Sequence, residues 1–145
     1  MSRPDPHRTS SGFYELIELP RIADCRGSLT ALEGGRQLPF DIARVYYLYD
    51  VPADATRGGH AHHQLNQLII AASGSFNVNL DNGLETKSVH LDRPDRGLLL
   101  RPMVWRMLDN FSNGALCLVL ASTAYDEADY IRDYDVFLRL VRNAE

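Results

Sequence analysis

This sequence of 145 residues has few cysteines, no excess of positive charge and no long uninterrupted run of apolar residues. Its two cysteines, Cys25 and Cys117, form no CxxC motif, which argues against a disulfide framework or zinc knuckle and favours a reduced, cytoplasmic location. The 15 lysines and arginines against 19 acidic residues give a net charge of -4, so neither nucleic acid nor an anionic membrane surface is the expected partner. No segment approaches the run of about 18 apolar residues that spans a membrane, and the N-terminus has no signal-peptide core.

The rest of the composition is that of one folded domain. Apolar residues make up 45% and charged residues 23% of the chain, close to the average for globular proteins. A length of roughly 100–200 residues corresponds to a single domain. Residues 1–12 are polar and contain two prolines, so they are expected to form a flexible tail in front of one domain at residues 13–145.

Short segments rich in β-branched and aromatic residues, separated by turn residues, run through this domain. They predict strands at 13–19, 28–32, 43–49, 67–72, 75–80, 87–91, 97–100, 105–108 and 115–122. Helical spacing occurs only near the C-terminus, where Tyr134, Phe137, Leu138 and Val141 recur on one face. The expected fold is therefore all-β, a barrel or sandwich with one short C-terminal helix.

Three of the five histidines lie within four positions. On a strand, residues two apart share a face, so His60 and His62 project together while His63 points away. Two imidazoles on the inner face of a barrel serve as metal ligands or as acid–base groups. A solvated or structurally satisfied pair is an equally good interpretation of this motif when it stands alone.

The spacing around the histidines resembles that of the cupin superfamily. Gln67 and Gly74 follow the HxH motif at the distances of the first cupin motif, and residues 97–102 resemble the second. Gln67 stands where metal-binding cupins usually carry Glu, and residues 105–107 read Trp-Arg-Met where the last His ligand is expected. Two imidazoles and a neutral amide make a poor divalent site. We therefore expect a cupin-type β-barrel, or jelly roll, that holds no metal.

Five further motifs narrow the resemblance. RGSLTALE (26–33), PFDIARVYYLYDVP (39–52), RGGHAH (57–62), GLLLRPMVW (97–105) and LASTAYDEADYIRDYDVFL (120–138) occur in this order. Together they resemble the sugar-nucleotide 3,4-ketoisomerases, the WxcM-like group of cupins, over about residues 13–140. The resemblance implies a cofactor-free isomerase that converts dTDP-4-oxo-6-deoxyglucose into the 3-oxo sugar for dTDP-3-amino-deoxysugar biosynthesis. It also implies a homodimer with an exchanged N-terminal strand.

The family resemblance and the chemistry together suggest catalytic residues. Moving a ketone from C-4 to C-3 requires removal of the C-3 proton by a base that titrates near working pH, and His60 stands at the family position for that base. His62, on the same face, is expected to relay a proton or to stabilise the enediolate. The developing oxyanion needs donors, and Arg57 and the hydroxyls of Tyr46 and Tyr47 are the candidates. Neighbouring tyrosines on a strand face opposite ways, so only one of these two is expected to enter the barrel.

The nucleotide diphosphate requires cations and a stacking surface. Arg26 and Arg44 are expected to make bidentate phosphate contacts, with Arg101 as a further candidate. Trp105 is a candidate lining of the sugar pocket. The expected substrate-binding residues are Arg26, Arg44, Tyr47, Gln67, Arg101 and Trp105.

Three other functions compete with the isomerase. A sugar-nucleotide 3,5-epimerase also uses a histidine base on a β-barrel. A non-catalytic cupin would bind a nucleotide sugar without exchanging its carbon-bound protons. A metal-dependent oxygenase would require iron or manganese.

Overall fold

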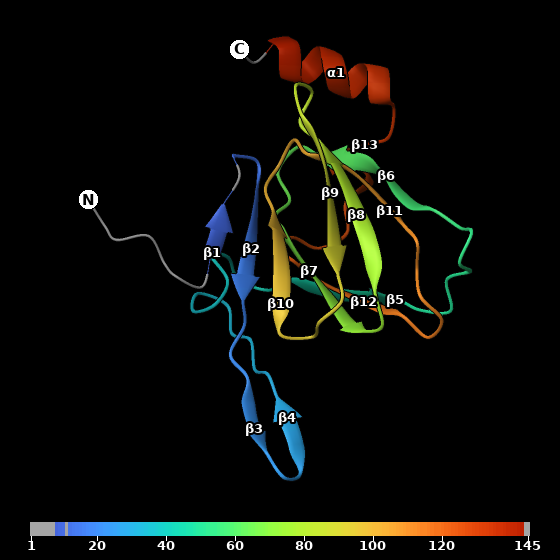
Figure 1. Ribbon diagram of the computed structural model, residues 1–145. Helices are drawn as coiled ribbons and strands as arrows, with labels where there is room; N and C mark the ends of the chain where they lie inside the picture. Colours follow the sequence, from blue (N-terminus) through green and yellow to red (C-terminus); the bar gives the residue numbers. More distant parts are fainter. Residues whose placement is uncertain (1–7, 11, 144–145) are drawn as a thin grey trace.

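The computed structural model describes residues 8–10 and 12–143, and it consists mainly of two facing antiparallel sheets (Figure 1). The first sheet has six strands in the order β1-β2-β10-β7-β12-β5, and the second has five in the order β13-β6-β11-β8-β9. The strands of the first sheet are β1 (Arg8–Ser10), β2 (Tyr14–Glu18), β5 (Arg44–Leu48), β7 (Gln67–Ser73), β10 (Arg96–Leu100) and β12 (Leu116–Ala121). Those of the second are β6 (Arg57–His62), β8 (Phe76–Asp81), β9 (Thr86–Leu91), β11 (Trp105–Asp109) and β13 (Tyr130–Ile131). The all-β cupin-type fold predicted from the sequence is confirmed.

The main core lies between the two sheets. Strand β8 shows why: Phe76, Val78 and Leu80 are buried, and the intervening residues are half-buried. The side-chain period of two in a strand sends the apolar set inward. A second cluster covers the outer face of the six-stranded sheet, where Leu38 of the 30–43 loop packs on Ile70 and its neighbours.

The N-terminal region differs from the expectation of a flexible tail up to residue 12. Arg8–Ser10 form β1, which pairs with β2 in antiparallel register. Residues 1–7 and 11 of the expected tail lie outside the described residues. Three residues are enough for a strand here because the edge of the sheet at β2 offers unpaired backbone groups.

A separate hairpin follows β2 and projects from the body of the molecule (Figure 1). It consists of β3 (Ile22–Asp24) and β4 (Gly27–Leu29), whose residues are all exposed. The sequence predicted a single strand at 28–32 and missed β3. The large apolar side chains of Ile22 and Leu29 are 68% and 58% exposed, so the hairpin presents apolar surface to solvent.

The C-terminal helix predicted from the spacing is confirmed as α1 (Tyr134–Asn143). A single 3-10 turn, η1 (Glu127–Asp129), and strand β13 precede it. Phe137 is fully buried, and it packs with Trp105 against the outer side of the second sheet. Neither α1 nor η1, the helices of the described region, is long and apolar enough to cross a membrane.

Candidate active site

A β-bulge in β6 determines which side chains of the RGGHAH motif enter the barrel. Strand β11 pairs Arg106 with His60 but Met107 with Gly58, so Gly59 is the extra residue of the bulge. Gly58 and Gly59 have φ values of 91° and 78°, in the left-handed region that glycine adopts without strain. The extra residue shifts the alternation by one position. His60 and Arg57, three residues apart, therefore face the same pocket.

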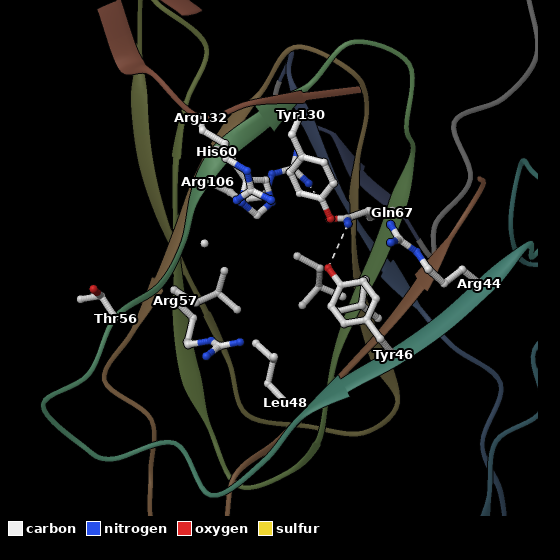
Figure 2. Close-up of a pocket in the computed structure, with 14 residues that line it drawn as sticks. Arg44, Tyr46, Leu48, Thr56, Arg57, His60, Gln67, Arg106, Tyr130 and Arg132 are labelled. Carbon is white, nitrogen blue, oxygen red and sulfur yellow. Dashed lines mark hydrogen bonds between the residues drawn. The ribbon is translucent and has the colours of Figure 1, made fainter. Parts of the chain in front are cut away.

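This pocket has a volume of about 460 Å³ and lies between the two sheets. Figure 2 shows Tyr46 and Leu48 on one wall and His60 with Tyr130 on the opposite one. The six-stranded sheet contributes Arg44, Tyr46, Leu48, Gln67, Ile69 and Val119. The second sheet and the loops that flank it contribute Thr56, Arg57, Gly58, His60, Arg106, Leu108, Tyr130 and Arg132. A floor of aliphatic residues beneath a ring of cations and one imidazole suits a polar ligand with an anionic part.

His60 is the imidazole that faces this cavity. Burial, together with the positive charges of Arg106 and Arg132, lowers the pKa of His60 to about 4. The ring is therefore neutral at pH 7 and has a lone pair to accept a proton. Tyr130 lies against it, with ring centroids 5.0 Å apart. A neutral, half-buried imidazole is suited to act as a general base.

His62 lies behind His60 and does not line the cavity. Its side chain is fully buried, its ring centroid is 4.9 Å from that of His60, and its Nδ1 is 3.3 Å from Oδ2 of Asp129. Burial and the charge of Arg106 lower the pKa of His62 to about 2. The face shared by the two histidines agrees with the sequence expectation. His62 is not among the residues that line the cavity, so its expected role, to relay a proton or to stabilise the enediolate, would have to act through His60.

Four arginines surround the cavity, and no aspartate or glutamate is among its lining residues. Arg132 pairs with Glu127 outside the cavity, with Nε–Oε1 and Nη2–Oε2 distances of 2.7 and 3.0 Å. Nε and Nη2 of Arg44 are buried and have no hydrogen-bond partner among the described residues. Burial lowers the pKa of Arg106 to about 10, so this residue remains protonated at pH 7. The cavity is therefore positive within a chain of net charge -4.

A chain of hydrogen bonds crosses the inner wall of the cavity. Arg106 Nη1 donates to Oε1 of Gln67 over 2.5 Å, and Nη2 donates to the carbonyl oxygen of Val104 over 2.8 Å. Gln67 Nε2 in turn donates to Oη of Tyr46 over 3.0 Å, drawn as a dashed line in Figure 2. Arg106 and Gln67 are 2% and 1% exposed. This chain joins the two sheets at the level of His60.

Four of the expected substrate-binding side chains lie away from this cavity. Tyr47 points outward from β5, where it is 58% exposed and stacks beside Tyr49 with a centroid distance of 5.7 Å. Arg26 lies in the projecting hairpin and pairs with Asp24. Arg101 pairs with Glu15 on the outside of the first sheet. Trp105 packs on the C-terminal helix. Strand alternation excludes Tyr47 and Trp105 because their neighbours Tyr46 and Arg106 occupy the inward positions.

Three lining residues with charged or aromatic side chains were not among the expected site residues: Arg106, Tyr130 and Arg132. Arg106 was signalled by its position, because it stands between Trp105 and Met107 where a cupin delivers its last ligand. Alternation with the apolar Val104 and Leu108 marks the same position as inward. Tyr130 and Arg132 come from the acidic segment before α1, whose fold over the barrel has no signature in the local sequence.

No group of three or more histidine, cysteine, aspartate or glutamate side chains that could hold a metal ion is found in the described part of the chain. The rings of His60 and His62 are in edge contact, but the third position of a cupin site is occupied by Gln67. The amide oxygen of Gln67 already accepts a hydrogen bond from Arg106, a cation that opposes metal binding. The donor set therefore does not fit a divalent metal.

Comparison with known proteins identifies the family. The family model described as "FdtA: WxcM-like, C-terminal" matches residues 13–142. The chain belongs to this family. The resemblance inferred from the motifs is thereby confirmed. The family match covers every strand of both sheets except β1, the bulge at Gly59 and all but the last residue of α1.

Three relatives illustrate the similarity. The TDP-4-oxo-6-deoxy-α-D-glucose-3,4-oxoisomerase of Aneurinibacillus thermoaerophilus is 42% identical over 127 residues, which cover 88% of this chain and 91% of the relative. A mutant of the 3,4-ketoisomerase QdtA of Thermoanaerobacterium thermosaccharolyticum, in complex with TDP-4-keto-6-deoxyglucose, has 42% identity and a TM-score of 0.90, covering 92% of this chain and 97% of QdtA. The TDP-quinovose 3,4-ketoisomerase WlaRB of Campylobacter jejuni has 48% identity and a TM-score of 0.84, covering 87% and 97%.

Proposed function

We propose that this protein is a nucleotide-sugar 3,4-ketoisomerase that moves the ketone of dTDP-4-oxo-6-deoxyglucose from C-4 to C-3. The observation that carries this proposal is the cavity itself. A neutral imidazole, His60, faces a space ringed by four arginines, with no lining carboxylate. The relatives named above are 3,4-ketoisomerases, and they match almost the whole chain.

The arginines bind the diphosphate of the substrate in this proposal. Figure 2 shows Arg44, Arg57 and Arg132 at three separate positions around the cavity. The buried, unpartnered nitrogens of Arg44 are donors suited to phosphate oxygens, because a guanidinium binds such oxygens in pairs. Glu127 holds Arg132 at the rim in a fixed orientation. The sugar is then placed against the aliphatic floor formed by Ile69, Leu108 and Val119.

His60 supplies the proton transfers at carbon. It removes the proton from C-3, and the electron pair of that bond forms the C-3 to C-4 double bond while O-4 takes up the negative charge. The Arg106 charge and the Tyr46 hydroxyl stabilise this oxyanion. In the second step the proton of the O-3 hydroxyl passes to O-4 as the C-3 ketone forms, and C-4 takes a proton from the His60 imidazolium, which returns His60 to its neutral form. The product is an isomer of the substrate, so no oxidant or reductant is consumed.

Substrate binding also adjusts the base. The positive charges of Arg106 and Arg132 contribute to the low pKa of His60 in the free protein. The phosphates of the substrate neutralise part of this field, which raises the pKa of His60 toward the working pH. His62 fixes the plane of the His60 ring from behind. It acts as a positioning residue in this scheme.

The proposal includes a homodimer with an exchanged N-terminal segment and a cytoplasmic location. The projecting β3–β4 hairpin, with Ile22 and Leu29 exposed, is the segment suited to exchange because it has apolar surface to bury. Exchange is also the route by which Arg26 reaches a cavity, that of the second copy. Free Cys25 and Cys117 suit a reducing compartment. The 3-oxo product is suited to amination in dTDP-3-amino-deoxysugar biosynthesis.

Proton NMR of dTDP-4-oxo-6-deoxyglucose incubated with the protein in heavy water tests this function. We expect a 3-oxo product that carries solvent deuterium at C-4. Unconverted substrate is also expected to exchange its C-3 proton for deuterium, because the same base removes it. Exchange at C-3 and C-5 with the 4-ketone intact would identify an epimerase, and binding without exchange a non-catalytic cupin. His60→Asn is expected to abolish turnover and keep TDP affinity within a few-fold. His63→Asn, which changes the exposed histidine next to this motif, is the matched control and should retain activity.

A further inference from the structure

Gln67 was expected to bind substrate, but both ends of its side chain are occupied by protein groups. Its Oε1 accepts from Arg106 and its Nε2 donates to Tyr46. The side chain is 1% exposed. A residue with this environment acts on the substrate through its partners rather than by direct contact.

Arg106 determines which way the Gln67 amide is turned. A guanidinium has five N–H donors and no acceptor, so only the carbonyl end of the amide can face it. The NH₂ end must then face the opposite wall, where Oη of Tyr46 lies 3.0 Å away. Arg106 is held in turn by the carbonyl oxygen of Val104, 2.8 Å from its Nη2. The orientation of the amide is therefore set by a buried cation.

The orientation of the Gln67 amide determines where the proton of the Tyr46 hydroxyl points. Its oxygen accepts the N–H of Gln67, so its own proton must point elsewhere. No acceptor for this proton is found among the described residues. Oη lies at the wall of the cavity, on the side facing His60 (Figure 2). The free direction of the hydroxyl proton is into the space that the reacting sugar occupies.

We infer that Gln67 is a positioning residue, whose amide, oriented by Arg106, makes the Tyr46 hydroxyl donate its proton into the cavity toward the oxygen that becomes negative. The inference rests on the proposed isomerase function. It also accounts for an amide at the position where metal-binding cupins carry Glu. A carboxylate there would pair with Arg106, accept the phenolic proton of Tyr46 and turn the donor away from the substrate.

Gln67→Glu is the variant that tests this arrangement, since it changes one atom of the amide and keeps the volume. We expect kcat to fall by about two orders of magnitude, the typical effect of losing one oxyanion donor, while KM and TDP affinity change by less than about threefold. Gln37→Glu, the same exchange in the loop on the outer face of the first sheet, is the control and should keep kcat. Thermal unfolding of both variants reports whether the fold is retained.

A double-mutant cycle with Tyr46→Phe separates positioning from a structural role. We expect Tyr46→Phe to lower kcat strongly in the native background and by less than about threefold in the Gln67→Glu background, because the donor is already diverted. If the kcat of the double variant falls by the product of the two single-variant factors, the inference is overturned. Gln67→Met, which leaves the Arg106 charge in place, should give an intermediate kcat.

A readout that needs no turnover keeps the inference distinguishable from the function. With tyrosine labelled by ¹³C at Cζ, NMR titration follows the Tyr46 phenol in the ligand-free protein. Burial raises the pKa of Tyr46, and Arg106 and the Gln67 hydrogen bond oppose this rise. Gln67→Glu should raise the pKa of Tyr46 further. An unchanged resonance and titration would refute the inference even if the native protein is an isomerase, whereas a shifted resonance in a protein without isomerase activity would refute only the proposed function.

Discussion

Arg57 and His60 line the same cavity although they are three positions apart on one strand. In an uninterrupted strand, residues three apart lie on opposite faces. The extra residue at Gly59 restores them to the same face. In the pairing with β11, Arg106 lies opposite His60 and Leu108 lies opposite Arg57, so three steps along β6 correspond to two steps along β11. The bulge thus places a cation beside the proposed base.

The bulge predicts unequal effects of two alanine substitutions. Both glycines have positive φ, so each substitution adds strain of about 1–2 kcal/mol. A Cβ at Gly58 would also lie 3.0 Å from the carbonyl oxygen of Arg106, whereas at Gly59 its nearest neighbour is the flexible Met107 terminus at 3.7 Å. Gly58→Ala should therefore lower the free energy of unfolding in urea, and kcat, more than Gly59→Ala. Equal losses would show that pairing with β11 is not the sensitive feature.

The two neighbouring tyrosines of β5 should respond differently to loss of the hydroxyl. Tyr46→Phe removes the donor at the cavity and is expected to lower kcat by about 10²-fold. Tyr47→Phe changes a side chain that is 58% exposed on the outer face and should leave kcat and KM unchanged. Steady-state kinetics of the two variants decides the assignment. A larger loss for Tyr47→Phe would mean that the outer face carries part of the site.

The pH dependence of kcat/KM reports the base in the free protein. His60 must be neutral to accept a proton, and its pKa is lowered to about 4. Activity should therefore persist as the pH falls through about 6.5, where an ordinary histidine loses half its basic form. Arg132→Gln removes one of the charges that lower the pKa of His60 and should move the acid limb to higher pH. Arg139→Gln on α1 is the control, and an acid limb unaffected by Arg132→Gln would contradict this electrostatic origin.

Stability should also fall at mildly acidic pH because of His62. Its pKa is lowered to about 2 in the folded state, whereas an unfolded histidine titrates near 6.5. The unfolded chain therefore binds the proton first, and this stability contribution, complete above about pH 6.5, is lost as the pH falls. Each such histidine adds a slope approaching about 1.4 kcal/mol per pH unit. The free energy of unfolding of His62→Asn, measured with urea between pH 8 and 5, should depend less steeply on pH than that of the native protein. An equal dependence on pH would exclude His62 as the source.

Arg44 is expected to stabilise the complex rather than the free protein. Two of its guanidinium nitrogens are buried without a hydrogen-bond partner among the described residues, which is unfavourable until an anion arrives. Arg44→Met should weaken TDP binding at least about tenfold, by calorimetry, and leave the free energy of unfolding equal or higher. A destabilised variant with native TDP affinity would show that Arg44 holds the barrel, through its contacts with Tyr46 and Tyr125.

Much of the molecule follows from local patterns. Alternation and turn residues located most of the strands, the apolar spacing located α1, and the HxH motif placed His60 and His62 on one face. The same alternation separates Tyr46 from Tyr47 once the orientation of one strand is known. It also separates Arg106 from Trp105. Which alternative faces inward is decided by packing of the whole barrel, because an isolated strand has two equivalent faces.

The sequence by itself determined the all-β fold, the family and the histidine pair, because each rests on short-range periodicity or on motifs in fixed order. Only the tertiary structure decided the composition of the cavity. Arg106, Tyr130 and Arg132 meet His60 through strand pairing and through the fold of the segment before α1 across the barrel. Arg26, by contrast, lies in the projecting hairpin, away from the cavity. A cluster of like charges in an acidic chain is a property of spatial arrangement, and residues as distant as 44 and 132 reveal it only when the two sheets face each other.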